Sequence, residues 1–335
     1  MSQLLEATTE EQRQRFRGMA GAPPLDAATM AMQRADAYWM IEAASGEIEA
    51  RCSLWWTDPP AYPEHRLGLL GHYAARDAGA GRLLLDEACA KLAARGCTMA
   101  VGPMDGNTWN RYRLVTERGT EPPFFLEPDT PADWPGHFTD AGFTSLAEYY
   151  SALSTDLARR DPRMEEVAVR LNALGVTIRP LRVDQFAEEM GRIYDVSKVS
   201  FQRNFLYTPI RRADFLAMYE PVKPYVHPAL VLLAEHEERP VGFIFTLPDL
   251  NQARRGEPID TLIIKTVAVL PEERYAGLGS LLVARGHEIA EAAGFRRVIH
   301  ALMHESNRSR RISGHYAETM RRYTLYSRRL WSAAA

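Results

Sequence analysis

The sequence predicts an α/β (α+β) chain built from two related domains in tandem, each a mixed, mostly antiparallel, twisted sheet flanked by helices. Three observations support this fold class. The chain has 335 residues, which is long for one hydrophobic core and suits two domains of ordinary size. A nine-residue pattern occurs twice. Each copy lies between short apolar segments and a longer segment with helical apolar spacing.

The repeated pattern is Arg-x-Ala-Gly-x-Gly-x-Leu-Leu, found at residues 76–84 and again at residues 274–282, 198 positions later. The spacing continues downstream without a gap, because Gly96 and Gly294 each follow the second glycine of their copy by 15 residues. A chance match of the motif would not be expected to extend to the residues that follow it. We therefore interpret the chain as a duplication.

Each copy is predicted to fold as strand, glycine turn, helix and strand. Apolar segments at 67–73 and 262–270 precede the two turns, and the second of them is rich in β-branched residues, as a buried strand would be. About 14 residues with helical apolar spacing follow each turn. Gly96 and Gly294 stand where a helix would end in a left-handed residue. This order is that of a crossover unit.

The remaining segments complete the two sheets. In the second copy we expect a strand at 176–181, a helix from 184 to about 200, a shorter helix near 213–219 and a hairpin of 230–234 with 241–246. In the first copy, residues 38–43 and 47–56 flank a turn in the same role. The predicted domains are residues 1–160, in a possibly degenerate copy, and residues 176–335. Residues 161–175 are the predicted linker, with a short connecting helix after the break at Asp161-Pro162.

The glycine turn indicates a site for phosphate groups. A strand that passes through such a turn into a helix presents unpaired backbone N–H groups at the positive end of the helix dipole, and the glycines allow a close approach. The leading arginine, Arg76 or Arg274, can add charge to the same anion. A dinucleotide fingerprint is excluded because Leu84 and Leu282 stand where its third glycine should be. Neither copy has the Gly-Lys-Ser/Thr of a Walker motif.

The second copy resembles the acetyl-CoA-binding segment of the GCN5-related N-acetyltransferase (GNAT) superfamily. That family carries Gln/Arg-x-x-Gly-x-Gly/Ala at a strand-to-helix turn, and residues 266–282 match it, including Pro271 after the strand. The resemblance covers roughly residues 176–330, and more faintly residues 30–150. It implies an acetyl-CoA-dependent N-acetyltransferase, with acetyl-CoA or another short acyl-CoA as the cofactor.

The resemblance also implies roles for individual residues. The backbone of Val267, Ala268 and Val269 would pair with the pantetheine arm. The diphosphate would be held at the turn, by residues Arg274, Tyr275, Ala276, Gly277, Leu278, Gly279 and Ser280. Asn307 resembles the family asparagine that contacts the cofactor arm. Tyr316 is the candidate catalytic acid that protonates the departing thiolate, although it stands two residues later than the family spacing, where Gly314 is found instead.

The first copy keeps Arg76, Gly79 and Gly81, so these are the possible cofactor-binding residues of the first domain. Its strand lacks the proline, and the segment from Gly102 to Arg113 does not resemble the family helix. That segment has two open interpretations: it binds the acceptor or cofactor, or it is an interdomain packing loop. We expect the second domain to be the catalytic one.

Composition narrows the class of protein further. The net charge of −3 gives no reason to expect nucleic acid, and no apolar run is long enough to cross a bilayer. The polar N-terminus lacks the features of a signal peptide, so we expect a cytoplasmic protein without a membrane partner. Three cysteines without metal-site spacing predict no metal, and His300 and His304 would lie about 13 Å apart on a strand.

The predicted reaction is transfer of an acetyl or other short acyl group from acyl-CoA to a primary amine of a small molecule, directly and within a ternary complex. No motif for a covalent nucleophile is present. Asp249, Asp260 or an ordered water could serve as the base. Two alternatives stay open: a non-catalytic acyl-CoA sensor, and a protein or peptide N-acetyltransferase. We expect a monomer, in which the fused copies form a pseudo-dimer, or a homodimer.

Overall fold

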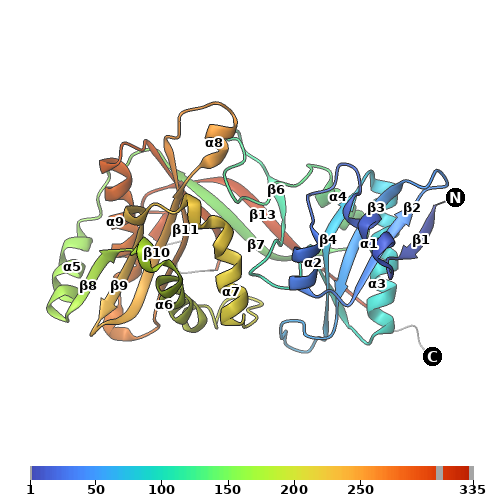
Figure 1. Cartoon of the computed structure of the whole chain (residues 1–335), viewed down its shortest axis with the longest axis horizontal. Helices are drawn as coiled ribbons and strands as arrows, with labels where there is room; N and C mark the ends of the chain where they lie inside the picture. The colour runs from blue at the N-terminus through green and yellow to red at the C-terminus, as the bar shows by residue number, and fades with distance from the viewer. Residues whose placement is uncertain (1, 307–311, 332–335) are drawn as a thin grey trace.

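The computed structural model describes residues 2–306 and 312–331, and it has two lobes joined by long strands (Figure 1). The first half of the chain forms β1 (Gln3–Glu6), α1 (Glu10–Arg17), α2 (Ala27–Gln33), β2 (Ala37–Glu42), β3 (Ile48–Trp55), β4 (Leu67–Ala75), α3 (Ala78–Ala94), β5 (Met99–Gly102), β6 (Leu114–Glu117), α4 (Trp134–Asp140) and β7 (Thr144–Ser154). The second half forms α5 (Arg163–Ala173), β8 (Val176–Pro180), α6 (Phe186–Ser200), α7 (Arg212–Tyr219), β9 (Val231–His236), β10 (Arg239–Pro248), α8 (Leu250–Arg254), β11 (Thr261–Val269), α9 (Leu278–Ala292), β12 (Arg297–His304) and β13 (Glu318–Arg329).

The predicted strand, turn, helix and strand are present in both copies, as β4-α3-β5 and as β11-α9-β12. In each copy the two strands are parallel neighbours, which is what a crossover through a helix produces. Gly96 and Gly294 have φ of 79° and 84°, so both end their helices in the left-handed conformation that a glycine adopts without steric cost. The predicted mixed α/β architecture is confirmed.

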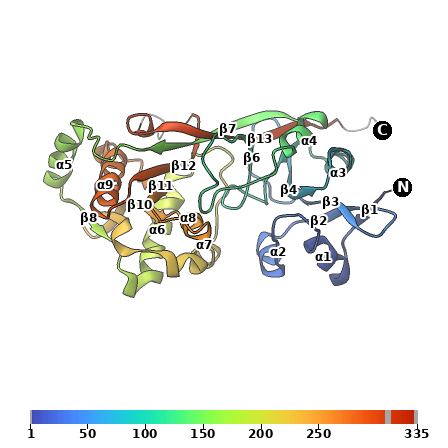
Figure 2. The same ribbon diagram turned by 90° about the horizontal axis from the view of Figure 1, so that it is seen from above.

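Within the described residues, the strands form a single 13-stranded mixed sheet that runs through both lobes. Its order is β1-β2-β3-β4-β5-β13-β7-β12-β11-β10-β9-β8, with β6 pairing with β13 beside this path. The last strand of each half crosses to the other half: β7 pairs with β12, and β13 pairs with β5. Figure 2 shows β7 and β13 side by side, spanning from one lobe to the other. Each lobe is therefore completed by a strand of the other half.

Buried polar contacts hold the crossing strands in place. Arg321 of β13 is 4% exposed and pairs with Glu127, at 2.5 Å between Nη1 and Oε2. The Tyr323 hydroxyl donates to the same carboxylate and lies 3.0 Å from the hydroxyl of Ser151 on β7. A buried pair of this kind costs much stability when one partner is removed, because the remaining charge is left uncompensated.

The segment between the two sequence repeats contains α5, within the predicted linker at residues 161–175. Its Val167 lies against Gly277, and Arg170 donates to the carbonyl oxygens of Arg274 and Ala276. The domain limits of 1–160 and 176–335 stay a prediction about sequence units. Because of the strand exchange, each lobe contains residues from both predicted domains. No helix within residues 2–306 and 312–331 has the length and apolar character to span a bilayer.

Candidate active site

The second glycine turn leaves a set of backbone donors open at the start of α9. Gly277 is the residue before the helix, with φ of 84°, and it offers no side chain that could cap the helix. The first intrahelical bond of this turn runs from Leu281 N to Gly277 O. In the described part of the chain, the amides of residues 277–280 have no acceptor. These donors lie at the positive end of a 15-residue helix and suit an anion.

The first glycine turn differs from the second in backbone and in chemistry, because α3 begins at Ala78 and contains Gly79, whereas Gly277 precedes α9. Asp77 caps α3 with its own side chain, since its Oδ1 accepts from Ala80 N at 2.9 Å. This hydrogen bond and the neighbouring Arg76 guanidinium lower the pKa of Asp77. Arg76, which could have served an anion, pairs instead with Glu49 at 2.6 Å and with Asp77. A carboxylate of the chain thus occupies the position where a ligand phosphate would lie.

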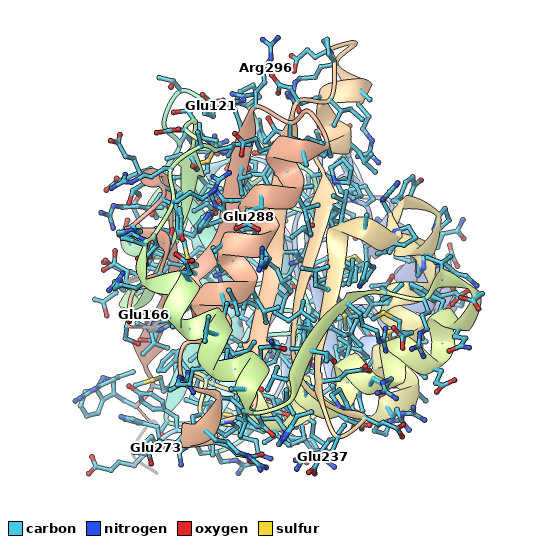
Figure 3. All side chains as sticks on the ribbon, turned by 90° about the vertical axis from the view of Figure 1, so that its left-hand side faces the viewer. Glu121, Glu166, Glu237, Glu273, Glu288 and Arg296 are labelled. Atoms are coloured by element: carbon cyan, nitrogen blue, oxygen red, sulfur yellow. The ribbon has the colours of Figure 1, made fainter. Side chains whose placement is uncertain are left out.

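The residue that distinguishes the two helix starts lies inside the repeated motif. At the position of Asp77, the second copy has Tyr275, which is buried and whose hydroxyl lies 2.9 Å from His236 Nδ1. Tyr275 therefore points away from the helix start, and no acid competes there with a ligand. The neighbouring Arg274 is held by Glu272 at 2.6 Å. Figure 3 shows α9 lying across the sheet, with Glu166 of α5 beside it and Glu273 below its first turn.

The strands next to the turn also differ between the two copies. Pairing of β11 with β12 ends at Ile264 and His300, whereas the pairing of β12 with β7 on its other edge continues to His304. Residues 266–269 of β11 pair on one side with β10. On the other side, the described residues supply one hydrogen bond, from the Ser200 hydroxyl to Val269 O at 2.9 Å. An extended ligand can therefore pair with this edge as an added strand.

In the first copy the corresponding edge is filled by the chain itself. Met104 N donates to Leu70 O at 2.8 Å, and His72 N donates to Asp105 Oδ1 at 2.6 Å. A side chain at Gly71 would approach Met104 O to 2.3 Å, so even a methyl group does not fit there. Of the two glycine turns, only the second combines free amides with an open strand edge.

The structure places the predicted site residues as follows. Val267, Ala268 and Val269 lie on the open part of β11, and residues 274–280 form the turn below it. Asn307 lies outside the described residues. Tyr316 is 6% exposed and packs on His287 of α9, with 4.7 Å between the ring centroids. Its ring is 6.4 Å from that of His300, where the β11–β12 pairing ends, and burial raises its pKa.

The two candidate carboxylate bases lie elsewhere. Asp249 caps α8 and accepts from Phe125 N at 2.8 Å, while Asp260 accepts from the side chain of Gln252 at 2.7 Å. Both flank the start of β11 at Thr261, about 13 Å along the strand from the point where the edge opens. These contacts give both carboxylates a structural role.

The loop from Gly102 to Arg113 joins the two lobes. Trp109 donates from Nε1 to Thr208 O at 2.8 Å and packs against Phe201 and Phe215 of the second half. Interdomain packing, one of the two interpretations of this loop, is thus present. Sequence reasoning missed that the loop also brings Arg113 to β12, where its Nη1 lies 3.4 Å from Leu302 O.

Sequence reasoning also missed Lys265, the first residue of the open edge. It is one of four lysines in the chain, and it interrupts an apolar strand, which was the available signal. Burial and the Arg113 guanidinium lower the pKa of Lys265 to about 8. The same two causes lower the pKa of His304.

Comparison with known proteins agrees with this geometry. Residues 193–312, which include the glycine turn, match the acetyltransferase (GNAT) family. The chain is 26% identical over 172 residues to "Protein YghO" of Escherichia coli and 25% identical over 197 residues to "Bacterial ceramide synthase" of Caulobacter vibrioides. These matches cover 51% and 58% of this chain, and they span about half the length of the two relatives, 44% and 51%.

Among solved structures, a tandem GNAT protein from the clavulanic acid biosynthesis pathway matches over the full length of both chains, with a TM-score of 0.52 and 13% identity. At that identity the match concerns the fold. The matched family is one of acetyltransferases, and the open turn lies within the matched residues. The match to the GNAT family covers residues 193–312 of this chain, and the chain as a whole has the fold of a tandem GNAT protein.

Proposed function

We propose that this protein transfers an acyl group from acyl-CoA to a primary amine of a small molecule, and that only its second domain binds the acyl-CoA. The observation that carries the proposal is the contrast between the two glycine turns. The first is capped by Asp77 and closed by Met104 and Asp105, whereas the second has free amides and an open edge. The acyl group is an acetyl or another short acyl group.

The proposed reaction is a direct transfer. The amine nitrogen attacks the thioester carbon, the carbon–sulfur bond breaks, an amide forms, and the proton lost by the amine balances the one gained by the departing thiolate. The turn at residues 277–280 would hold the diphosphate, and the edge at residues 265–269 would align the arm that carries the thioester. Holding both reactants together lowers the barrier by several kcal/mol. In this proposal Tyr316 is the acid that protonates the sulfur.

We further propose that the acceptor is a free small molecule rather than a nucleic acid or a membrane component, and that the protein is a monomeric pseudo-dimer or a homodimer. The β7–β13 exchange supports the pseudo-dimer, because the two halves already bury their edges against each other.

Calorimetric titration with acetyl-CoA tests the site. Gly277 is a poor position for a substitution because its φ is positive and a Cβ there would lie 3.0 Å from Val167. Gly279 is better, since a Cβ there meets nothing closer than Val269 at 3.7 Å. We expect Gly279→Asp to weaken binding by roughly 100-fold or more, because it puts a carboxylate among the phosphate donors. Gly279→Ala should stay within a few-fold of the wild type.

The first copy offers a matched control. Gly79→Asp adds the same charge to an exposed position in the equivalent turn, and we expect acetyl-CoA affinity to be unchanged. The proposal fails if Gly79→Asp abolishes binding and Gly279→Asp does not. A panel of amines and of acyl-CoA chain lengths from acetyl to palmitoyl then tests the reaction, the longer chains being included because one relative is named a ceramide synthase. Binding without turnover of any amine would favour the sensor.

A further inference from the structure

Two cations, the buried Arg113 and the partly buried Lys265, lie where β11 and β12 separate, and neither has an acidic partner among the described residues. Arg113 is 6% exposed, and its Nε is buried without a hydrogen-bond partner in the described structure. No carboxylate of the described chain lies within ion-pair distance of either cation. Every Asp and Glu belongs to the described residues, because residues 1, 307–311 and 332–335 contain none. No side-chain carboxylate of the protein therefore neutralises this site.

The Arg113 side chain is held in a fixed orientation. Its guanidinium lies over the rings of Tyr112 and Tyr149, at 4.1 Å and 4.3 Å from their centroids. Its Nη1 points to Leu302 O at 3.4 Å. The edge formed by Nε and Nη2 has no partner within the described residues, and this edge is the fork that binds two oxygens of one anion.

The backbone around the two cations is irregular on both strands. The register between β10 and β11 shifts opposite Lys265, which is thus the extra residue of a β-bulge. The register between β12 and β7 shifts between His300 and Met303, and Leu302 in that interval has φ of 59°. Arg113 itself has φ of 75°. Non-glycine residues in this conformation are strained, and such strain is concentrated at functional sites.

His304 adds a third basic group to the same place. Its ring packs on Tyr149, with 4.8 Å between centroids, and its Nε2 is buried without a partner among the described residues. Its Nδ1 is occupied by Ser306. Leaving buried donors unpaired is costly, so the group that pairs with them is expected to come from a ligand.

We propose that Arg113 and Lys265 bind a carboxylate carried by the amine acceptor, so that the acceptor is an amino acid or a related amine with a carboxylate group. This inference rests on the proposed function, because it assigns the acceptor class of the same site. A single guanidinium fork with one ammonium group matches one carboxylate in charge and geometry. The site adjoins the first residues of the open edge, so a carboxylate held there places the amine beside the thioester.

The test is calorimetry on the full-length protein saturated with CoA, the non-reactive product. The probes are the common amino acids, β-alanine and γ-aminobutyrate. Each is compared with the amine that lacks its carboxylate, and phosphoethanolamine is included as a phosphate-bearing amine. We expect at least one carboxylate-bearing amine to bind, and its decarboxylated counterpart to bind at least about 10-fold more weakly.

Variants of Lys265 separate a binding role from a structural one. Lys265→Met should weaken binding of the carboxylate probe by roughly 10- to 100-fold without changing the affinity for CoA. Lys265→Arg should restore most of the lost affinity. Lys198→Met, on the exposed side of α6, is the control and should bind as the wild type does.

Each other outcome is decisive. The inference is overturned if CoA binds but no carboxylate probe does, if Lys265→Met leaves carboxylate affinity unchanged, or if phosphoethanolamine is the only probe that binds. Failure of CoA itself to bind would instead refute the proposed function, and that is measured first, in the absence of any amine.

Discussion

Replacing Lys265 by Met should make the protein more stable, which is unusual for a substitution at a partly buried strand position. Burial and the Arg113 guanidinium lower the pKa of Lys265 from 10.5 to about 8. The protonated side chain is therefore disfavoured in the folded protein relative to the unfolded chain. Methionine keeps an unbranched stem of similar length and removes the charge.

The magnitude follows from the difference between the two pKa values. Each pKa unit corresponds to about 1.4 kcal/mol, so a fall from 10.5 to about 8 is worth on the order of 3 kcal/mol at pH 7. The sign is fixed by proton binding. Between about pH 8 and 10.5 the unfolded chain binds more protons than the folded protein, so the free energy of unfolding of the wild type rises with pH over this interval.

Urea denaturation of wild type, Lys265→Met and Lys198→Met at pH 7 and at pH 10.5 measures this effect. We expect Lys265→Met to exceed the wild type by roughly 3 kcal/mol at pH 7 and by much less at pH 10.5. Lys198→Met, at an exposed position, should follow the wild type at both pH values. If Lys265→Met is equally stable or less stable at pH 7, Lys265 is not an uncompensated cation, and the reasoning about the anion site is wrong.

Three further predictions concern the cap, the strand exchange and the buried histidines. Asp77→Ala removes the cap of α3, so denaturation should show a loss of about 1 kcal/mol, while acetyl-CoA affinity stays the same; a change in affinity would bring the first turn into the binding site. Arg321→Met leaves the buried Glu127 carboxylate without its cationic partner, so stability should fall by roughly 3 kcal/mol, and calorimetry should show one shifted transition for both lobes rather than two. His287 and His300 lie 2.8 Å apart between their Nε2 atoms, and burial lowers their pKa values to about 4 and about 3. The unfolded chain therefore binds more protons below about pH 6.5, so stability should fall as the pH drops from there toward 4, and replacing both histidines by leucine should flatten that dependence; an unchanged slope would contradict it.

Local patterns in the sequence were sufficient for the repeated unit. The two Arg-x-Ala-Gly-x-Gly motifs predicted β4-α3-β5 and β11-α9-β12, because a glycine turn between an apolar strand and an amphipathic helix is specified by residues close together in the chain. The helix-end glycines, Gly96 and Gly294, were predictable for the same reason.

The strand exchange was not predictable in this way. Nothing local in β7 or β13 distinguishes pairing with its own half of the chain from pairing with the other half. Pairings such as Ser151 with Arg321 join residues far apart in the sequence, and they depend on how the two lobes meet.

The difference between the two turns was visible in the sequence but not recognised. Asp77 and Tyr275 occupy the variable position of the same motif, and aspartate is a strong helix cap. The cation pair was harder to find, because Arg113 and Lys265 come from different halves of the chain and meet through the interdomain loop.

The most direct test of the account is a crystal structure of the protein with CoA. It should show the diphosphate within hydrogen-bonding distance of the amides at residues 277–280 and the pantetheine arm along residues 265–269, while the turn at residues 76–81 carries no CoA. Diphosphate density at Asp77, or an empty turn at Gly277 in crystals saturated with CoA, would contradict the central claim.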